Sequence, residues 1–505
     1  MVARRTALLA APGLALAGAI QAQPRAPFTL GVASGEPTPS GVVLWTRLAP
    51  EPLRPDGGMQ APVPVDWVVA EDPGLRRIVA RGQEMAVAEE AHSVHAEVAG
   101  LRPGRDYWYR FMAMGAASPV GRTRTAPAAG AMPQRLRLAI ASCQQYEHGY
   151  YGAHRHIAAS APDLVLFLGD FIYEASWGRN LVRHHDTPTA RTLADYRARH
   201  ALYRGDEDLQ ASCAAAPWMV TWDDHEVSND YANDVGERER GAPFLERRAA
   251  GYRAFWEHQP LPRSMKPQGP NARIFRRAAF GGLAEIHMLD DRQYRDPQAC
   301  QRPDRGGATR VTLENCPELA DPARSILGRD QEAWLLDGLR QGRSRWTLVA
   351  QQTRFARFGG DRTPPVYWTD GWDGYPASRR RILDALAVRR PDQGTPLVLG
   401  GDIHAFFAAD LRPDFDRAET PSVAVELVGT SITSQNNARY AERYAQDPHV
   451  LFADAAYRGW LDVTLTRGRA EARMMALRDV RDRMTDAFPL KSFVVEAGRP
   501  RLQPG

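Results

Sequence analysis

Polar and ionisable side chains follow six apolar segments of the chain that have the pattern of short β-strands. In an α/β sheet, ligands bind outside the carboxyl ends of the strands, so groups that lie far apart in sequence can meet there. One strand that ends in Asp means little, because Asp is common in turns and at helix N-caps. Six polar ends in one region indicate a site. The six ends are Ser142-Cys143-Gln144, Gly169-Asp170, Asp223-Asp224-His225, Asp290-Asp291, Gln351-Gln352 and Gly401-Asp402-Ile403-His404.

Three aspartates at these ends, Asp170, Asp224 and Asp402, are candidate metal ligands. Like charges that are packed closely are costly unless a cation neutralises them. Carboxylate oxygens suit hard cations such as Ca²⁺, Mg²⁺ or Mn²⁺. The same positions therefore predict at least one bound cation.

Cys143, Tyr173 and His404 point to a different kind of ion. Thiolate, phenolate and imidazole together favour a transition metal, and a phenolate favours oxidised iron. Alone, each of these residues is better explained as a buried core side chain. Their shared position at strand ends favours a mixed metal cluster.

Such a cluster could activate a water molecule and hold both oxygens of an in-line displacement at phosphorus. His225 stands beside Asp224 and could protonate the leaving group or stabilise developing charge. Asp290 and Gln351–Gln352 are weaker candidates, since only their position after a strand supports them.

Before this region, the chain from Phe28 to Pro127 alternates short β-type segments with turn signals, and no helix of ordinary length fits. We therefore expect a small β-sandwich. The segment Leu101–Tyr109 resembles the tyrosine corner of fibronectin type III domains, in which a Tyr hydroxyl bonds back to the turn. A linker rich in Ala, Pro and Gly follows at Thr123–Pro133. The expected strands are Phe28–Val32, Val42–Arg47, Val65–Ala70, Val94–Val98 and Tyr107–Met112.

From Arg135 onward, apolar strands alternate with helical patterns, which predicts an α/β domain. The expected strands are Leu136–Ser142, Leu164–Leu168, Met219–Trp222, Ala284–Leu289, Trp346–Ala350 and Leu397–Gly400, with Trp460–Thr466 and Ala470–Leu477 around the turn Arg467–Arg469. The expected helices are Tyr151–Ala159, Leu193–Tyr203, Leu245–Glu257, Asp330–Leu339 and Ser378–Val388.

The first residues predict export. Arg4 and Arg5 precede an apolar stretch from Ala7 to Ile20, which is too short to span a bilayer comfortably, and Ala22 offers a cleavage point. The paired arginines favour the twin-arginine route and its export machinery over a general secretory signal, although Ala7 stands where that motif usually has Phe. No other segment predicts a membrane span.

Composition and cysteine usage fit a globular exported protein. A net charge of +4 over 505 residues predicts no stable nucleic-acid partner. Export permits disulfides, and Cys300 and Cys316 flank a loop-like stretch, so we expect them to pair. Cys213 lies in an Ala-rich segment and is expected to be a small buried side chain.

The combined segments resemble the PhoD-type alkaline phosphatases, a branch of the calcineurin-like metallophosphoesterases. The resemblance implies an α/β (α+β four-layer) sandwich behind an all-β, fibronectin III-like domain. The implied parts are a signal peptide at 1–22, the β-sandwich at 28–127, the catalytic domain at 135–480 and a C-terminal tail at 481–505. The matching segments are Ala141–Tyr146, Leu168–Glu174, Thr221–Asn229, Trp372–Tyr375, Gly400–His404 and Val428–Ser434.

Members of that family are exported phosphomonoesterases or phosphodiesterases that contain a ferric ion and calcium, so the resemblance implies Fe³⁺ with one or two Ca²⁺. By similarity, Cys143 and Tyr173 bind the iron, Asp170 bridges iron and calcium, and His404 is a further ligand on the iron side.

On the calcium side, the resemblance implies Asp224 and Asn229 as ligands, with Asp402 also binding metal. His225 corresponds to the histidine that acts on the phosphoryl group in the wider superfamily.

The sequence therefore predicts a monomeric, periplasmic or secreted hydrolase of small phosphate mono- or diesters that uses a metal-bound hydroxide. One alternative is a phospholipase D-like phosphodiesterase on the same cluster, which activity on diesters and phospholipids would distinguish. A second is a non-catalytic binding protein with a structural metal. The many polar strand ends argue against it, because a structural site needs closed coordination.

Overall fold

The computed structural model describes residues 26–358, 364–390, 393–417, 419–436, 441, 443 and 445–505. The expected signal peptide at residues 1–22 lies outside this part of the chain. Among the described residues, no helix combines the length and the apolar character needed to cross a membrane.

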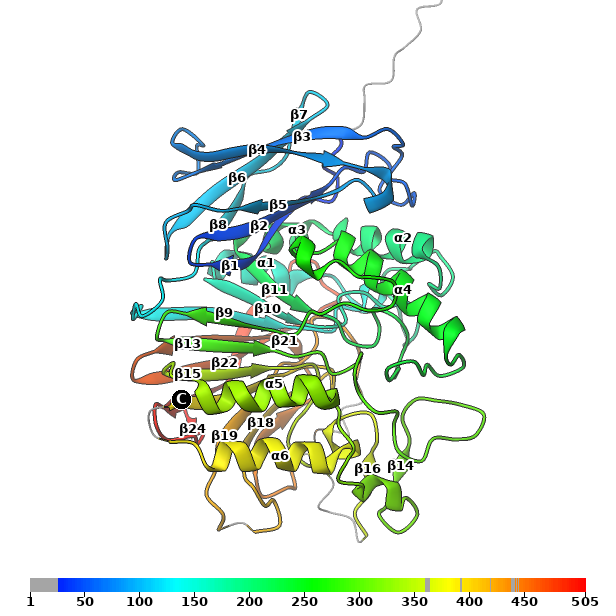
Figure 1. The fold of residues 1–505 in the computed structure, drawn as a ribbon, viewed down its shortest axis with the longest axis vertical. Helices are drawn as coiled ribbons and strands as arrows, with labels where there is room; N and C mark the ends of the chain where they lie inside the picture. Colours follow the sequence, from blue (N-terminus) through cyan, green and yellow to red (C-terminus); the bar gives the residue numbers. More distant parts are fainter. Residues whose placement is uncertain are drawn as a thin grey trace, which may run out of the picture.

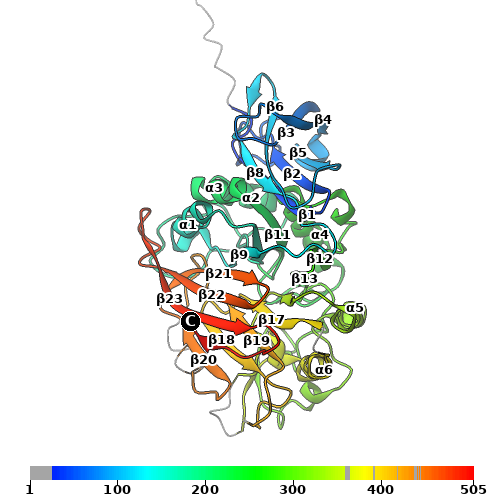
Figure 2. The same ribbon diagram turned by 90° about the vertical axis from the view of Figure 1, so that its left-hand side faces the viewer.

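The protein is built on two large sheets that lie between two layers of helices (Figures 1 and 2). The ten-stranded sheet has the order β24-β23-β22-β21-β9-β10-β11-β1-β2-β5, and the seven-stranded sheet has the order β12-β13-β15-β17-β19-β18-β20. Helices α1 (Gly152–Ser160), α2 (Leu193–Arg204), α3 (Glu207–Ala215) and α4 (Ala242–Glu257) cover the first sheet; α5 (Gly328–Gln341) and α6 (Pro376–Ala387) cover the second. This is the four-layer α/β arrangement predicted from the sequence.

Side chains that alternate along a single strand pack into two different hydrophobic cores, one on each face of the sheet. In β9 (Arg135–Ala141), Leu138 and Ile140 face the seven-stranded sheet, whereas Ala139 and Ala141 face the first group of helices. Strands with both faces buried read as continuous apolar segments, which is why the sequence revealed them. The parallel strands that matter for the site are β9, β10 (Leu164–Leu168) and β11 (Pro217–Thr221) in one sheet, and β13 (Ala284–Met288), β15 (Trp346–Ala350) and β17 (Thr395–Gly400) in the other.

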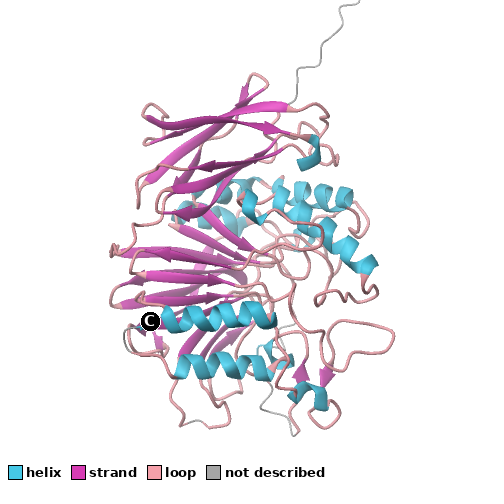
Figure 3. Ribbon diagram, viewed as in Figure 1, coloured by secondary structure: helices cyan, strands magenta, loops and turns pink. Residues whose placement is uncertain are grey.

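The remaining strands extend both sheets. Beyond β9, the ten-stranded sheet continues with β21 (Arg458–Thr466), β22 (Arg469–Leu477), β23 (Ala487–Glu496) and β24 (Gln503–Pro504). The seven-stranded sheet is completed by β12 (Arg276–Phe280), β18 (Phe406–Leu411), β19 (Ala424–Val428) and β20 (Val450–Asp454). Short strands β14 (Arg310–Val311) and β16 (Tyr367–Trp368) pair separately. Figure 3 shows the long loops gathered at one side of the strands.

The N-terminal region is all β, as predicted, and its strands belong to two sheets. Strands β3 (Val63–Ala70), β4 (Ile78–Ala86), β6 (Asp106–Ala113), β7 (Ala116–Ala117) and β8 (Gly121–Arg124) form a separate sheet. Strands β1 (Val32–Thr38), β2 (Gly41–Arg47) and β5 (Ser93–Val98) continue the ten-stranded sheet, because β1 pairs in parallel with β11. The predicted tyrosine corner is present: the Tyr107 hydroxyl accepts the Arg102 N–H at 2.9 Å.

Side chains also join the N-terminal strands to helix α4. The Trp45 indole donates to the Glu257 carbonyl at 3.0 Å, and His95 stacks on Trp256 with ring centroids 4.0 Å apart. Because these groups are buried, the two regions share one continuous interior.

Two local expectations differ from the structure. The first strand begins at Val32 rather than Phe28, since residues 28–31 form a turn. Residues 481–505, expected as a tail, contain β23, which pairs with β22 and places Phe493 and Val495 in the core between the sheets.

Helix α3 was not predicted from the sequence because its segment is short. Asp206 caps its start by accepting two backbone N–H groups.

Candidate active site

Ends of strands from both large sheets meet at one place. Ligand atoms of Cys143, Asp170 and His404 lie within 4.8 Å of one another, and so do those of Asp170, Asp224 and His225. Cys143 follows β9 and Asp170 follows β10, whereas His404 follows β17 of the other sheet. The two sets share Asp170, so together they form one continuous polar site.

The backbone at this site is strained. Cys143, Asp170, Asp402 and His404 have φ values of 59°, 55°, 61° and 51°, in the left-handed region. Non-glycine residues in that region cost about 1–2 kcal/mol each. Such strain gathers where function fixes the direction of a side chain, and four of the predicted ligands carry it here.

Tyr173 connects the two sides of the Cys143 group. Its hydroxyl donates to Asp170 Oδ2 at 2.7 Å and lies 3.1 Å from His404 Nε2. Burial raises the pKa of the Cys143 thiol and of the Tyr173 phenol well above their usual ranges, and the nearby Asp170 carboxylate adds to both. Ionised thiolate and phenolate here therefore require a compensating positive charge, and a bound cation would supply it.

The ring of His404 is oriented by a short hydrogen-bond chain. Its Nδ1 lies 2.8 Å from the Gln435 carbonyl, so Nδ1 carries the proton and Nε2 faces Tyr173 as a free acceptor. The Gln435 N–H in turn donates to His148 Nδ1 at 3.0 Å, and His148 Nε2 bonds the Trp177 carbonyl at 2.7 Å. Burial lowers the pKa of His404 to about 3, which keeps the ring neutral, as a metal ligand must be.

The carboxylate side is buried and partly uncompensated. Asp170 Oδ1 and Asp224 Oδ1 are buried and have no hydrogen-bond partner among the described residues. Burial raises the pKa of Asp170 well above its usual range. For Asp224 burial acts in the same direction, but Arg292 and His225 outweigh it and lower the pKa. Buried carboxylate oxygens without partners fit a cation, so the residues present suit a metal site.

Arg292 supplies the main fixed positive charge beside these carboxylates. Its fully buried guanidinium pairs with Asp223, bonds Asp370 at 2.9 Å and lies 3.7 Å from Asp224. The acidic strand ends are thus balanced by an arginine on one side.

His225 is held by a carboxylate. Its Nδ1 lies 2.7 Å from Glu174 Oε2, and Glu174 Oε1 accepts the backbone N–H of Asn229 at 2.8 Å. Burial opposes protonation of His225, but Glu174, Asp224 and Asp170 raise its pKa well above the usual value. These carboxylates therefore favour the protonated ring, which can donate a proton.

Other predicted residues have different surroundings. Asp402 lies outside both ligand sets and accepts the Thr353 hydroxyl at 2.6 Å, and burial raises its pKa to about 6. Asp290 accepts two backbone N–H groups of its own turn, and the Gln352 amide ties the ends of β11 and β13 together. These last two residues therefore serve the structure around the site.

Two pockets open beside the site and share Asn229 and Glu237 in their walls. One, of about 350 Å³, is lined by His225, Glu174 and Trp177. The other, of about 270 Å³, is lined by Asp230, Arg302 and Trp368. An ester group at His225 would have space on both sides of Asn229.

Sequence reasoning missed several residues that shape the site. Glu174 and Ser434 lie inside the segments that carry the family resemblance, and their roles could have been sought there. The Ser434 hydroxyl donates to the Tyr173 hydroxyl at 2.8 Å. Arg292 directly follows the strand end Asp290-Asp291, but nothing in the sequence indicates that its side chain turns inward. His148 gives no pattern signal, because its role depends on a loop from another part of the chain.

The fold and the polar strand ends define the class of this chain as a hydrolase of phosphate esters, and the comparisons with known proteins agree. The family model for PhoD-like phosphatases matches residues 138–474, and the model for the N-terminal domain of the same phosphatases matches residues 13–127. The chain belongs to the PhoD-like phosphatase family.

Individual relatives give the same result. Alkaline phosphatase D of Bacillus subtilis (strain 168) is 44% identical over 467 residues, which cover 89% of this chain and 78% of the relative. A solved structure described as the structure of PhoD superposes with a TM-score of 0.88 at 42% identity, covering 95% of this chain and 92% of that one. The predicted family and enzyme class are therefore confirmed.

Proposed function

We propose that the protein is an exported, metal-dependent phosphoesterase that hydrolyses phosphate mono- or diesters at the strand-end site. The observation that carries the proposal is the position of Asp170, whose carboxylate belongs to both sets of potential ligands. A carboxylate shared in this way suits a bridge between two cations. Paired cations can activate water and stabilise the oxygens of an in-line displacement at phosphorus.

On one side of Asp170, Cys143, Tyr173 and His404 would hold a ferric ion. Their thiol, phenol and imidazole groups form a donor set that prefers a transition metal to calcium or magnesium. The Nε2 atom of His404 supports this assignment, because the bond from Nδ1 to the Gln435 carbonyl leaves Nε2 free to bind a metal. A trivalent cation would also drive ionisation of the buried thiol and phenol.

On the other side, Asp224 and Asn229 would hold one or two calcium ions, with Asp402 nearby as a further candidate ligand. The buried oxygen Asp224 Oδ1 has no hydrogen-bond partner among the described residues, and hard oxygen ligands suit calcium. The superposition with the related solved structure supports the fold on which this site is built.

His225 would be the catalytic residue. Glu174 fixes Nδ1 of its ring, so Nε2 is the atom left to donate a proton to the departing ester oxygen. The protonated ring would also stabilise negative charge on the phosphoryl group, as buried positive groups do in sites of low dielectric constant.

We also propose the surrounding organisation. Residues 28–127 would act as an N-terminal domain attached to the catalytic region 135–480, and cleavage after Ala22 would release a monomeric enzyme into the periplasm or medium. The sequence at Arg4 and Arg5 supports export of a folded, metal-loaded protein by the twin-arginine route.

The proposal can be tested by metal analysis and activity on the same purified sample. We expect iron and calcium by elemental analysis, a visible absorption band from thiolate or phenolate bound to ferric iron, and release of product from chromogenic mono- and diesters. Cys143→Ala should remove the absorption band. Asp170→Ala should remove both metals and lower the activity by at least about 10²-fold.

A colourless, iron-free and fully active enzyme would overturn the cofactor assignment. Retention of full activity by both variants would overturn the site. Asp337→Ala provides a matched control, because Asp337 is an exposed carboxylate of α5 that lies outside the ligand sets.

A further inference from the structure

The side chain of Asn229 is held in one orientation by an acidic neighbour. Its amide nitrogen Nδ2 donates to Glu237 Oε1 at 3.2 Å, and its backbone N–H donates to Glu174 Oε1 at 2.8 Å. A carboxylate can only accept hydrogen bonds, so Glu237 selects the nitrogen end of the amide. The oxygen Oδ1 therefore points away from Glu237 and stays available as a ligand.

Glu237 is itself fixed by a loop from another part of the chain. Arg305 donates to Glu237 Oε1 at 2.7 Å, and the Gly306 N–H donates to the Glu237 carbonyl at 3.0 Å. A Cβ atom at Gly306 would lie 2.4 Å from the Gly236 carbonyl oxygen, so the two backbones approach as closely as glycine allows. Both the side chain and the backbone of Glu237 thus depend on this contact.

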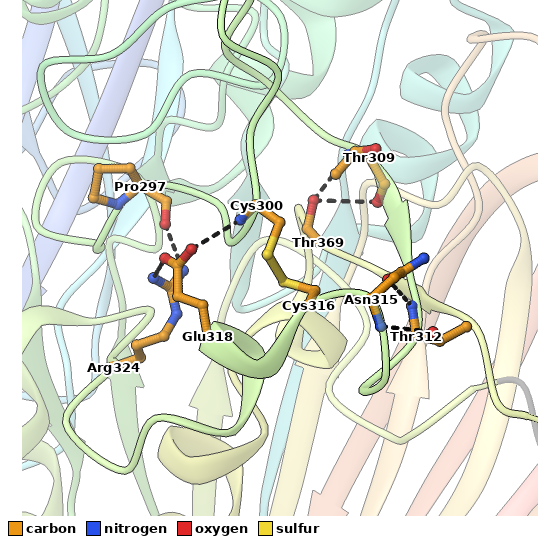
Figure 4. Close-up of a disulfide and its surroundings, with 9 residues drawn as sticks. All are labelled: Pro297, Cys300, Thr309, Thr312, Asn315, Cys316, Glu318, Arg324 and Thr369. Carbon is orange, nitrogen blue, oxygen red and sulfur yellow. Dashed lines mark hydrogen bonds and ion pairs between the residues drawn. A yellow bond between two sulfur atoms is a disulfide. The ribbon is translucent and has the colours of Figure 1, made fainter.

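A disulfide closes that loop. Cys300 and Cys316 are bonded, and the Cys300 N–H donates to Glu318, which Arg324 holds from the other side (Figure 4). Within the loop, the Ala308 N–H donates to Asp230 Oδ2 at 3.2 Å. The disulfide-closed loop, residues 300–316, therefore contacts the turn that follows Asn229 at two places.

The same turn continues to the predicted ligand Asp224. The Asp230 N–H donates to Asp224 Oδ2 at 2.6 Å, which leaves Asp224 Oδ1 as the oxygen without a hydrogen-bond partner among the described residues, 3.7 Å from the Arg292 guanidinium. Protein contacts thus hold the amide nitrogen of Asn229 and one carboxylate oxygen of Asp224, and the remaining side-chain oxygen of each residue is left for an ion. None of these hydrogen bonds joins the disulfide-closed loop to Cys143, Tyr173 or His404.

We propose that Glu237, fixed by the disulfide-closed loop, is a positioning residue that directs Asn229 Oδ1 at the hard cation and thereby sets the calcium affinity of the site. This inference rests on the proposed function. If the amide turned over, its NH₂ group would face the cation, and a hydrogen-bond donor cannot serve as a calcium ligand. Residues that orient ligands in this way commonly contribute 10- to 100-fold to metal affinity.

The test uses three single variants of the iron-loaded protein: Glu237→Ala, Glu237→Gln and Glu239→Ala. The Gln side chain keeps an oxygen that can accept from Asn229, whereas Ala does not. Glu239 is the matched control, because it lies on the same turn and pairs with Arg191 and Arg247 without contacting Asn229. Calcium dissociation constants are measured by titration calorimetry, and the ferric absorption band is recorded in parallel.

We expect Glu237→Ala to raise the calcium dissociation constant by about 10- to 100-fold, with an unchanged absorption band. Glu237→Gln should stay within about threefold of the parent protein, and Glu239→Ala should match it. Equal calcium affinity in Glu237→Ala and the parent, or equal losses in the Ala and Gln variants, would overturn the inference while leaving the proposed function intact. A parent protein that binds no calcium would overturn both.

Discussion

The Oε2 atom of Glu174 lies 2.7 Å from Nδ1 of His225, in a position that fixes the imidazole ring at the centre of the site. The other oxygen of the same carboxylate accepts the N–H of Asn229. One buried side chain therefore sets the direction of the proposed acid and the backbone of a proposed ligand. Both belong to the segment that follows β11, whereas Glu174 follows β10.

We expect Glu174→Ala to lower kcat by about 10- to 100-fold, the usual effect of removing a group that orients a catalytic residue. The ring of His225 would lose its anchor and part of its positive charge, while the ligand atoms of Cys143, Asp170 and His404 would stay in place. Steady-state kinetics with a chromogenic ester gives kcat and KM, and elemental analysis gives the iron content. Glu239→Ala serves as the control, and normal kcat in Glu174→Ala would contradict the role.

The sequence predicted the strands of the site well because their physical signal is local. Strands β10 and β15 have the predicted bounds, and the polar residues after them follow directly. Because both faces of such strands are buried, their residues form uninterrupted apolar segments, and neither an alignment nor tertiary information is needed to find them. The pairing of Cys300 with Cys316 was predictable for a similar reason, since both flank one short loop.

The rest depends on contacts between distant segments. The inward turn of Arg292, the bond from Glu174 to His225 and the parallel pairing of β1 with β11 join parts of the chain with no shared local pattern. The left-handed backbone at Cys143 is also invisible to propensity, because propensity disfavours that conformation for cysteine. Surrounding structure imposes it.

Arg292 provides a test of charge balance. Arg292→Leu would leave Asp223 buried without its cation, whereas Asp370 would keep its ion pair with Arg295. We expect a loss of about 3–5 kcal/mol in the free energy of unfolding. The loss should grow as pH rises, because burial raises the pKa of Asp223 and Arg292 opposes that rise, so without the arginine Asp223 ionises only at a cost. Urea denaturation followed by tryptophan fluorescence measures it.

Arg329→Leu is the control for this variant, since Arg329 is exposed in the first turn of α5 and its replacement should change stability by less than about 0.5 kcal/mol. If the two leucine variants unfolded at the same urea concentration, the buried guanidinium would not be what balances the acidic strand ends.

The burial of His95 leads us to expect that acid weakens the contact between the N-terminal strands and α4. Burial lowers its pKa to about 3, whereas an unfolded histidine titrates near 6.5. As pH falls below 6.5, the unfolded chain takes up a proton that the folded chain refuses, so stability is lost between pH 6.5 and 3. Each such histidine adds a slope of up to about 1.4 kcal/mol per pH unit.

We expect His95→Gln to reduce that slope by about one histidine's share, while lowering stability at pH 8 through loss of the stack on Trp256. Urea unfolding across pH 4 to 8 gives the comparison. His184→Gln is the control, because His184 is exposed and should leave the slope unchanged. Parallel pH profiles for the parent and His95→Gln would contradict a neutral, buried His95.

The disulfide predicts a redox-dependent sensitivity of the loop to protease. Closing a loop of this size lowers the entropy of the open state by the equivalent of about 3 kcal/mol, which corresponds to roughly a hundredfold change in the opening equilibrium. Arg305 is exposed in the loop and precedes Gly306, so trypsin can cut there once the loop opens, whereas Pro303 protects the bond after Arg302.

Reduction of the disulfide should therefore accelerate tryptic cleavage after Arg305, as followed by mass spectrometry. A Cys300→Ser/Cys316→Ser variant should be cut equally fast without reductant. Cleavage at the same rate in the oxidised and reduced parent would show that the contacts of Arg305 and Ala308, rather than the disulfide, hold the loop against Glu237 and Asp230.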